Sequence, residues 1–234
     1  MAQQQLLQPM SLKAFEESTS NSTESKKLTW LEQFKFSYSA PVKGETFKFD
    51  VYLEAKAFDS DQCINWFKLL LGIPEFWQQL EAHHPGRTSP VPRLSALCSQ
   101  APVGEELQIN QVLYTSVRPP ALISELWLKI CEKLNWKQEM GHVVALRFRD
   151  GTHSVGYHNW EPEEHLADTP GVAYLWLGQS RPVLFRNASQ KVTRRFTFMD
   201  GTLFVTLPES WNDWQIQVPK SKSCHNESIL LIFK

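Results

Sequence analysis

The chain has 234 residues, enough for one large hydrophobic core or two small ones at the usual size of roughly 100–200 residues per domain. Hydrophobic residues make up 42% and aromatic residues 12%, which excludes a chain that is disordered throughout. Lys and Arg number 24 against 25 for Asp and Glu, so the net charge of -1 gives no long-range attraction to phosphate or anionic lipid. Any contact with nucleic acid therefore has to come from a local basic patch.

The cysteine pattern and the hydropathy pattern both bear on the compartment. The four cysteines are widely spaced and include no C-x-x-C pair, which is typical of reduced thiols rather than of a zinc site or a disulfide framework. No apolar run approaches the ~18 residues of a membrane span, and the first residues lack the layout of a secretory signal. We therefore expect an intracellular protein of the nucleus or the cytoplasm, with no membrane partner.

Composition divides the chain into three parts. Residues 1–27 are rich in Gln, Ser, Thr and Glu and have few branched apolar side chains, which predicts a flexible tail. Residues 28–45 form a linker or lead-in segment. From Thr46 to Leu53 apolar and polar residues alternate, which predicts a half-buried strand and the start of a domain over 46–234.

Two helices are expected in the first half of this domain. One, of about three turns, is predicted within DSDQCINWFKLLLG, because a candidate N-cap stands at Asp59 or Ser60 and Gly72 ends the segment before Pro74. Its apolar residues at helical spacing are Ile64, Phe67 and Leu71. The second begins after Pro119-Pro120 and should pack on a sheet. Its apolar residues at helical spacing are Ile123, Leu126, Ile130 and Leu134.

Between these helices, the stretch from His83 to Gly104 is crowded with Pro and Gly. Such composition predicts an irregular surface segment, of the kind that forms a lid or a substrate loop.

Strands dominate after His142. Seven short apolar runs recur, separated by Gly, Pro, Asn and Asp: VVALRF, VAYLWL, PVLFR, RRFTF, LFVTL, WQIQV and SILLIF. Asp200-Gly201 lies between two of them and predicts a tight hairpin turn. The whole domain is predicted to be α+β, with two N-terminal helices covering a sandwich or jelly-roll core.

The order of five segments in this half is informative: RFRDGTHSVGYHNWEPE, LWLGQSRPVLFRN, MDGTLFVTLP, WNDWQIQVP and ILLIFK. Together they resemble the AlkB family of iron(II)- and 2-oxoglutarate-dependent nucleic-acid dealkylases, over about Phe47 to Lys234. The resemblance implies a double-stranded β-helix core with N-terminal covering helices. It also implies an H-x-D pair, a distal histidine and a last strand that begins and ends with arginine.

The iron ligands that the resemblance implies are two imidazoles and one carboxylate on one face of the metal. His158 stands at the first position. Trp160 stands where the family carries the aspartate, and Ile216 stands at the distal histidine; neither can bind iron. The alternation of Trp214, Ile216 and Val218 independently predicts that Ile216 points inward.

The positions that hold 2-oxoglutarate in the family have changed in the same direction. The arginine that pairs with the cosubstrate corresponds to Ser228, the asparagine two residues later to Leu230, and the closing arginine to Lys234. An asparagine and a tyrosine upstream correspond to Leu146 and Phe148. The resemblance thus implies a pseudoenzyme with no cofactor expected, working in a lineage of DNA repair or modification.

Two alternatives remain. One is an active but divergent dealkylase of methylated DNA or RNA bases, which would need Fe(II), 2-oxoglutarate and a substitute ligand such as Glu161. The other is a scaffold that binds a protein partner and no nucleic acid.

A candidate nucleic-acid interface lies around the middle strands. Five basic residues and no acidic residue occur between Arg181 and Arg195, interleaved with Phe185 and Phe196. Phosphates bind cations and bases stack on aromatic rings, so this composition favours DNA or RNA. With Arg93, which matches a short family segment on the substrate side, the candidates are Arg93, Arg181, Arg186, Lys191, Arg194, Arg195, Lys220 and Lys222.

Overall fold

The computed structural model describes residues 36–37, 40–42, 45–47, 50–99, 102–109, 111–137, 141–159, 171–189, 191–206 and 213–234, with side chains from Val51 onward. All of them belong to one compact unit, Phe34–Lys234. The predicted tail, residues 1–27, lies outside the described residues.

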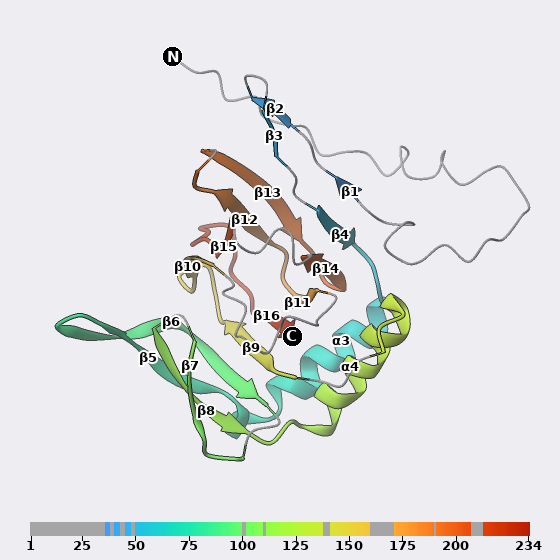
Figure 1. The fold of residues 1–234 in the computed structure, drawn as a ribbon. Coiled ribbons are helices and arrows are strands. Elements are labelled where there is room, and N and C mark those ends of the chain that lie inside the picture. Colours follow the sequence, from blue (N-terminus) through green and yellow to red (C-terminus); the bar gives the residue numbers. More distant parts are fainter. Residues whose placement is uncertain are drawn as a thin grey trace, which may run out of the picture. The chain divides into compact units, whose positions relative to one another are not determined.

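Ten strands form the larger sheet (Figure 1). In spatial order they are β1 (Phe36–Ser37), β4 (Asp50–Glu54), β14 (Thr202–Thr206), β11 (Val172–Gly178), β16 (Ser228–Phe233), β9 (Val143–Phe148), β6 (Arg87–Cys98), β5 (Gln78–His84), β8 (Val112–Val117) and β7 (Glu106–Ile109). Neighbours in this order pair antiparallel, as in β11 with β16 and β16 with β9. Through β1 the sheet reaches upstream into the lead-in segment.

The smaller sheet has four strands, in the order β10 (Val155–Asn159), β15 (Trp214–Val218), β12 (Arg181–Asn187) and β13 (Val192–Phe198). A separate pair joins β2 (Ala40–Val42) to β3 (Glu45–Phe47). The predicted strand over 46–53 is therefore divided, because β3 pairs with β2 and β4 joins the larger sheet.

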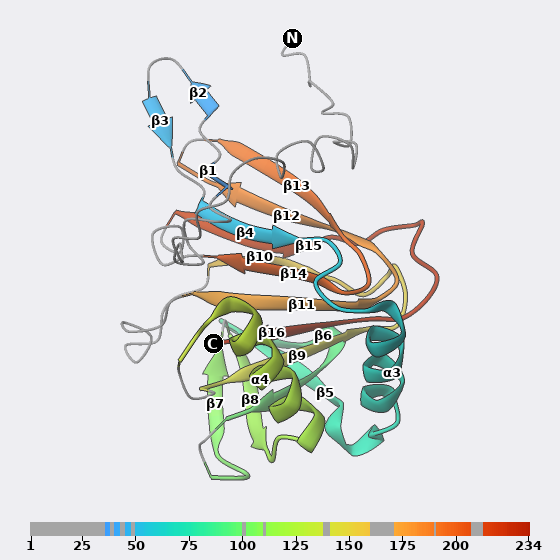
Figure 2. The same cartoon turned by 90° about the vertical axis from the view of Figure 1, so that its right-hand side faces the viewer.

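The core lies between the two sheets and takes residues from both. Figure 2 shows α3 and α4 on the side of the molecule away from β12 and β13. Alternate residues of β12 and β15 are buried, as expected for strands with one face inward. On β9, β11 and β16 both faces are buried, because the opposite face carries helices. This double burial explains why these three strands read as nearly continuous apolar runs.

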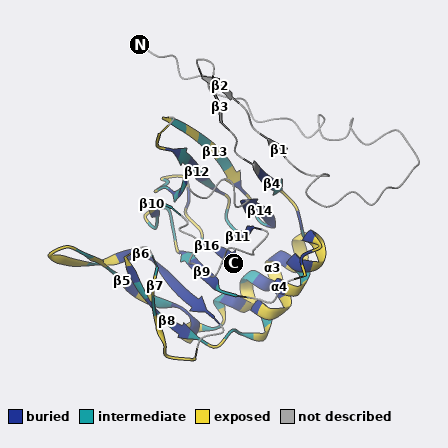
Figure 3. Ribbon diagram, viewed as in Figure 1, coloured by how far each residue is buried: buried dark blue, intermediate teal, exposed yellow. Residues whose placement is uncertain are grey.

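Helices α3 (Ser60–Leu71) and α4 (Ala121–Leu134) are both confirmed, and a short 3-10 turn, η1 (Pro74–Phe76), follows α3. The Asp59 side chain accepts from the first backbone N–H groups of α3, as predicted. Trp127 of α4 stacks on Phe233 of β16 with ring centroids 5.9 Å apart, which places α4 on the larger sheet. Exposed residues lie along both helices (Figure 3).

The buried face of α3 differs from the predicted one. Cys63, Trp66 and Leu70 are buried, whereas Ile64 is 44% exposed. The sequence offers two overlapping apolar stripes, and Trp66 decides between them because it is the largest side chain to bury.

The segment from His83 to Gly104 is not irregular, which corrects the prediction. It holds most of a long antiparallel hairpin, β5–β6, which projects from the larger sheet (Figure 1). Pro90 and Pro92 are tolerated because both are exposed and the pairing register shifts between Gln79 and Glu81.

All seven strands predicted after His142 are present, but β10 was missed. Asp200-Gly201 forms the expected tight turn, with Gly201 at φ 77°. It is not a hairpin, because β13 belongs to the smaller sheet and β14 to the larger one. The turn instead carries the chain from one layer to the other.

Two further findings concern the thiols and the helices. The four cysteines are free and buried. Neither of the described α-helices is long and apolar enough to cross a membrane.

Candidate functional site

His158 lies on β10, the strand that the sequence analysis missed. The pairing of β10 with β15 shifts register between Val155 and His158, and His158 then stands opposite Ile216. Ile216 in turn stands opposite Phe185 of β12. Ile216 is 2% exposed and belongs to the core between the sheets, which confirms that it points inward. The imidazole therefore has a hydrocarbon neighbour across the strand pair.

The protonation of His158 is set by its surroundings. Nδ1 lies 2.9 Å from the carbonyl oxygen of Gly156, which can only accept, so Nδ1 carries the proton in the neutral ring. Burial is the main cause that lowers the pKa of the imidazole to about 4; the hydrogen bond to Gly156 opposes this shift, and the positive charges of Arg93 and Lys234 add to it. The ring is therefore neutral at physiological pH.

On the larger sheet, the residues aligned with the cosubstrate positions come together. Leu230 of β16 pairs with Leu146 of β9, and Ser228 pairs with Phe148 two residues further along. All four are buried, with Phe148 and Ser228 fully excluded from solvent. The structure thus places these four residues on two neighbouring strands, and the group presents three hydrocarbon side chains and one hydroxyl.

Aromatic rings fill the space beside this group. Trp176 of β11 stacks on Phe148 with centroids 5.7 Å apart and meets the edge of Phe198 at 6.1 Å. Phe204 lies 5.2 Å from Phe198 and 4.9 Å from Phe185. Trp176 was not among the residues predicted from the sequence. The indication available there was the pair of bulky aromatic residues, Tyr174 and Trp176, on one face of a buried strand.

Arg181 is an internal residue, which corrects its prediction as a nucleic-acid contact. It is fully buried, and its Nη atoms donate to the carbonyl oxygens of Asp150, His153 and Pro219 at 2.9, 2.8 and 3.3 Å. The guanidinium also lies 4.9 Å from the centroid of the Phe148 ring. Arg181 therefore ties loops to the core instead of facing solvent.

Arg93 is also largely buried, with 9% of its surface exposed. It is therefore not one of the surface residues that could contact nucleic acid. The remaining predicted contacts are at least partly accessible. Lys191, Arg195, Lys220 and Lys222 are exposed, and Arg186 and Arg194 are half-buried. Arg186 lies over the ring of Tyr157 at 3.9 Å and donates twice to Oε1 of Gln215.

These contacts define an outward patch on the smaller sheet, made of Tyr157, Leu184, Arg186, Arg195 and Gln215. Arg195 stands opposite Leu184, and Gln215 opposite Arg186, so all face away from the core. The four described strands of this sheet contain no acidic residue. The patch is thus cationic, and one face of its half-buried aromatic ring, Tyr157, is covered by Arg186.

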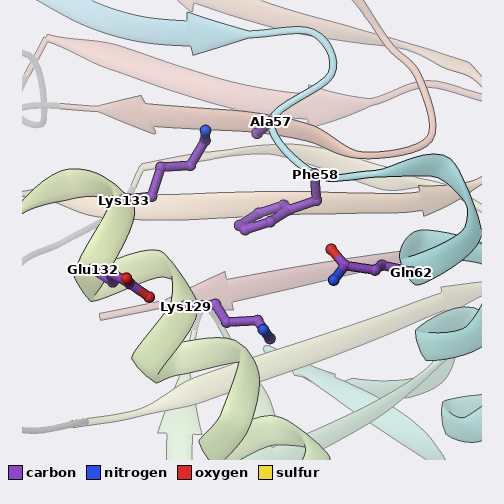
Figure 4. Close-up of a pocket in the computed structure, with 6 residues that line it drawn as sticks. All are labelled: Ala57, Phe58, Gln62, Lys129, Glu132 and Lys133. Carbon is purple, nitrogen blue, oxygen red and sulfur yellow. The ribbon is translucent and has the colours of Figure 1, made fainter.

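A pocket of about 320 Å³ lies elsewhere, between α3 and α4 (Figure 4). It is lined by Ala57, Phe58, Gln62, Lys129, Glu132 and Lys133. The ammonium group of Lys133 is 3.0 Å from Glu54 and 5.7 Å from the centroid of the Phe58 ring. The pocket is on the helical side of the larger sheet and has no residue in common with the His158 region.

The described residues around His158 do not fit iron and 2-oxoglutarate. No group of three or more His, Cys, Asp or Glu side chains within the described part of the chain could hold a metal. Trp160 and the alternative ligand Glu161 lie outside the described residues. What is described around His158 offers one imidazole to a metal and no arginine at the Ser228 position.

No family model matches the sequence, and no curated protein matches it. Solved structures do match. OsALKBH1 is 12% identical, with 79% of this chain and 97% of that chain covered and a TM-score of 0.52. An oxidoreductase of the 2OG-Fe(II) oxygenase family from Burkholderia pseudomallei is 17% identical, with 78% and 84% covered and a TM-score of 0.49. A Pseudomonas putida prolyl-4-hydroxylase is 11% identical, with 79% and 91% covered and a TM-score of 0.47.

At such identities the likeness concerns the fold alone. The OsALKBH1 match confirms the predicted fold class, a mostly antiparallel jelly roll of the kind found in 2OG-Fe(II) oxygenases. The roles of individual residues do not follow from it.

The pKa of His158 leads to a testable dependence on pH. The folded-state pKa of about 4 lies below the ordinary value of ~6.5, so the unfolded chain binds the proton first as the pH falls. The contribution of His158 to stability is complete above about pH 6.5 and is lost between about pH 6.5 and 4, by on the order of 3 kcal/mol. Between about pH 6.5 and 4, the free energy of unfolding of the wild type should fall by this amount relative to that of His158→Gln. Chemical denaturation at each pH measures it.

His225, which is exposed, provides the control. His225→Gln should follow the wild type across the same pH range. A pKa near 6.5 for His158, measured by NMR titration, would contradict the interpretation.

Proposed function

We propose that this protein is a non-catalytic member of the dioxygenase fold, with no working site for iron or 2-oxoglutarate, and that it acts by binding nucleic acid. The observation that carries the first part is the pairing of His158 with Ile216, where the resemblance implies two imidazoles side by side. A facial iron site needs three protein ligands, and one neutral imidazole does not compete for the metal in water.

The cosubstrate pocket supports the same proposal. A dicarboxylate such as 2-oxoglutarate needs a charged partner and hydrogen-bond donors in place of the water that it loses. Ser228, Leu146 and Phe148 offer one hydroxyl among hydrocarbon, and Trp176 packs against Phe148. Lys234 is the one aligned position that keeps a cation. Burying these apolar side chains stabilises the fold by about 25 cal/mol per Å². In this proposal, the apolar side chains stabilise the fold but do not bind a dicarboxylate.

The outward patch supports the second part of the proposal. Arg186 and Arg195 supply cations, and Tyr157 supplies a ring, on a sheet face without acidic residues. Single-stranded nucleic acid binds to such surfaces through phosphate contacts and base stacking. A protein partner has no specific observation in its favour, whereas the pairing of ring and guanidinium suits bases and phosphates together.

The first test is metal and cosubstrate binding. We expect protein prepared anaerobically with Fe(II) to carry well under one equivalent of iron after desalting. We also expect Fe(II) to leave its affinity for 2-oxoglutarate unchanged, and no succinate to form. Metal analysis, calorimetry with and without Fe(II), and a turnover assay measure these quantities. Stoichiometric iron with metal-dependent binding of 2-oxoglutarate would restore the divergent dealkylase.

The second test is the salt dependence of oligonucleotide binding. We expect Arg186→Ala and Arg195→Ala each to weaken binding of single-stranded DNA or RNA, and to reduce the slope of log K against log salt by about 1. Fluorescence anisotropy over a range of salt concentrations measures this slope.

Lys68→Ala serves as the matched control, because Lys68 is exposed on α3, on the helical side of the larger sheet. It should leave both the affinity and the slope unchanged. Equal loss in all three variants, or the absence of any salt-sensitive binding, would rule out the patch as the interface.

A further inference from the structure

Arg93 is a buried cation whose donors are mostly unused. It is 9% exposed, and its side chain makes one hydrogen bond, from Nη1 to the carbonyl oxygen of Ser154 at 3.4 Å. Nε is fully buried and has no hydrogen-bond partner. No carboxylate of the described chain forms an ion pair with it. Burying a guanidinium this way costs several kcal/mol unless something else compensates its charge.

Arg181 is the better compensated of the two internal arginines, although its Nε, like that of Arg93, is buried without a hydrogen-bond partner. Its Nη atoms donate to three carbonyl oxygens and the guanidinium lies over an aromatic ring. Arg93 has no such set. The contrast indicates that Arg93 is not held merely as a structural tie.

The unused atoms of Arg93 form one edge of the guanidinium. Because Nη1 faces Ser154, the Nε and Nη2 groups remain, and these two donate in parallel. This fork matches two oxygens of one carboxylate or phosphate group. Ser95, two residues along the same face of β6, adds a hydroxyl that is likewise buried without a partner.

The electrostatic setting favours an anion at this place. Arg93 and Lys234 are the charged groups that act on His158, and both are positive. Lys234 is 3% exposed, so its charge is poorly screened by water. The backbone N–H of Ser154 donates to the carbonyl oxygen of Pro92 at 2.9 Å, which closes the seam between β6 and the start of β10. Arg93 thus lies at a seam between the two sheets, where the charges recorded as acting on His158 within the described part of the chain are both positive.

We propose that Arg93 and Ser95 form a metal-free site for a small oxyanion at this seam, bound through the Nε–Nη2 edge of the guanidinium. The ligand is a carboxylate of a small organic acid or a phosphate group; both present the paired oxygens that this edge accepts. The site is separate from the outward patch and does not depend on nucleic-acid binding.

Thermal unfolding with defined anions tests the site. Succinate and inorganic phosphate are titrated separately at constant ionic strength, set with sodium chloride, with EDTA present to remove metals. At roughly one hundred times Kd, we expect the Tm of the wild type to rise by about 5 °C or more. A response to succinate alone identifies an organic acid, one to phosphate alone identifies a phosphate compound, and a response to both establishes a general oxyanion site.

Variants distinguish this site from general salt effects. Arg93→Met should abolish the response and should not lower the Tm in anion-free buffer, because it removes an uncompensated buried charge. Arg93→Lys keeps the charge but loses the fork, and should raise Kd at least tenfold. Arg195→Met, which removes an exposed arginine, should respond like the wild type.

Two results would overturn the proposal. In the first, succinate and phosphate change the Tm of the wild type no more than chloride does, which would mean that Arg93 binds water and no oxyanion. The other is a response that persists in Arg93→Met and Arg93→Lys. EDTA keeps this test independent of the proposed absence of an iron site, because binding that requires a metal would give no shift of Tm when the metal is removed.

Discussion

The packing of apolar side chains between the two sheets is the constraint on which the rest of the structure depends. Trp176, Phe148, Phe198 and Phe204 form a chain of ring contacts with centroids 5.2 to 6.1 Å apart. A ligand-binding jelly roll needs polar groups facing its interior, and each such group must be paired when it is not bound. Here Leu146, Phe148 and Leu230, at the aligned positions, belong to the core.

The two internal arginines show how this core treats charge. Arg181 is accommodated because loop carbonyls and the Phe148 ring surround it. Arg93 lies at the seam with its buried Nε unpaired. The aligned positions near Ser228 are mostly apolar, whereas β6 carries a buried guanidinium with few partners. The proposed absence of iron chemistry and the proposed oxyanion site therefore rest on different residues.

The sequence predicted this architecture through its regular patterns. The alternation in WQIQV placed Ile216 inward, and the cap at Asp59 marked the start of α3, because both depend on local periodicity and hydrogen bonding. It failed where tertiary context decides. Arg181 reads as a surface cation until the carbonyls of Asp150 and Pro219 are known to surround it. The β5–β6 hairpin tolerates Pro92 because it lies in a shift of the pairing register, and Pro90 because it is exposed.

The candidate site was predictable only in part for the same reason. His158 and Ile216 could be aligned from segment order, but β10 itself carries too weak an alternation to be recognised. Trp176 could not be assigned to the interior of the sandwich, because β11 is buried on both faces and its pattern does not tell them apart. Distinguishing the two faces required the positions of the helices.

The free energy of unfolding of Trp176→Ala tests the central claim most directly, because the claim is that protein side chains fill the interior. If they do, the truncation leaves a cavity among Phe148 and Phe198, and the protein loses about 3–5 kcal/mol of stability. A loss below about 1 kcal/mol would mean that the interior has room to spare beside Phe148, and would contradict the account.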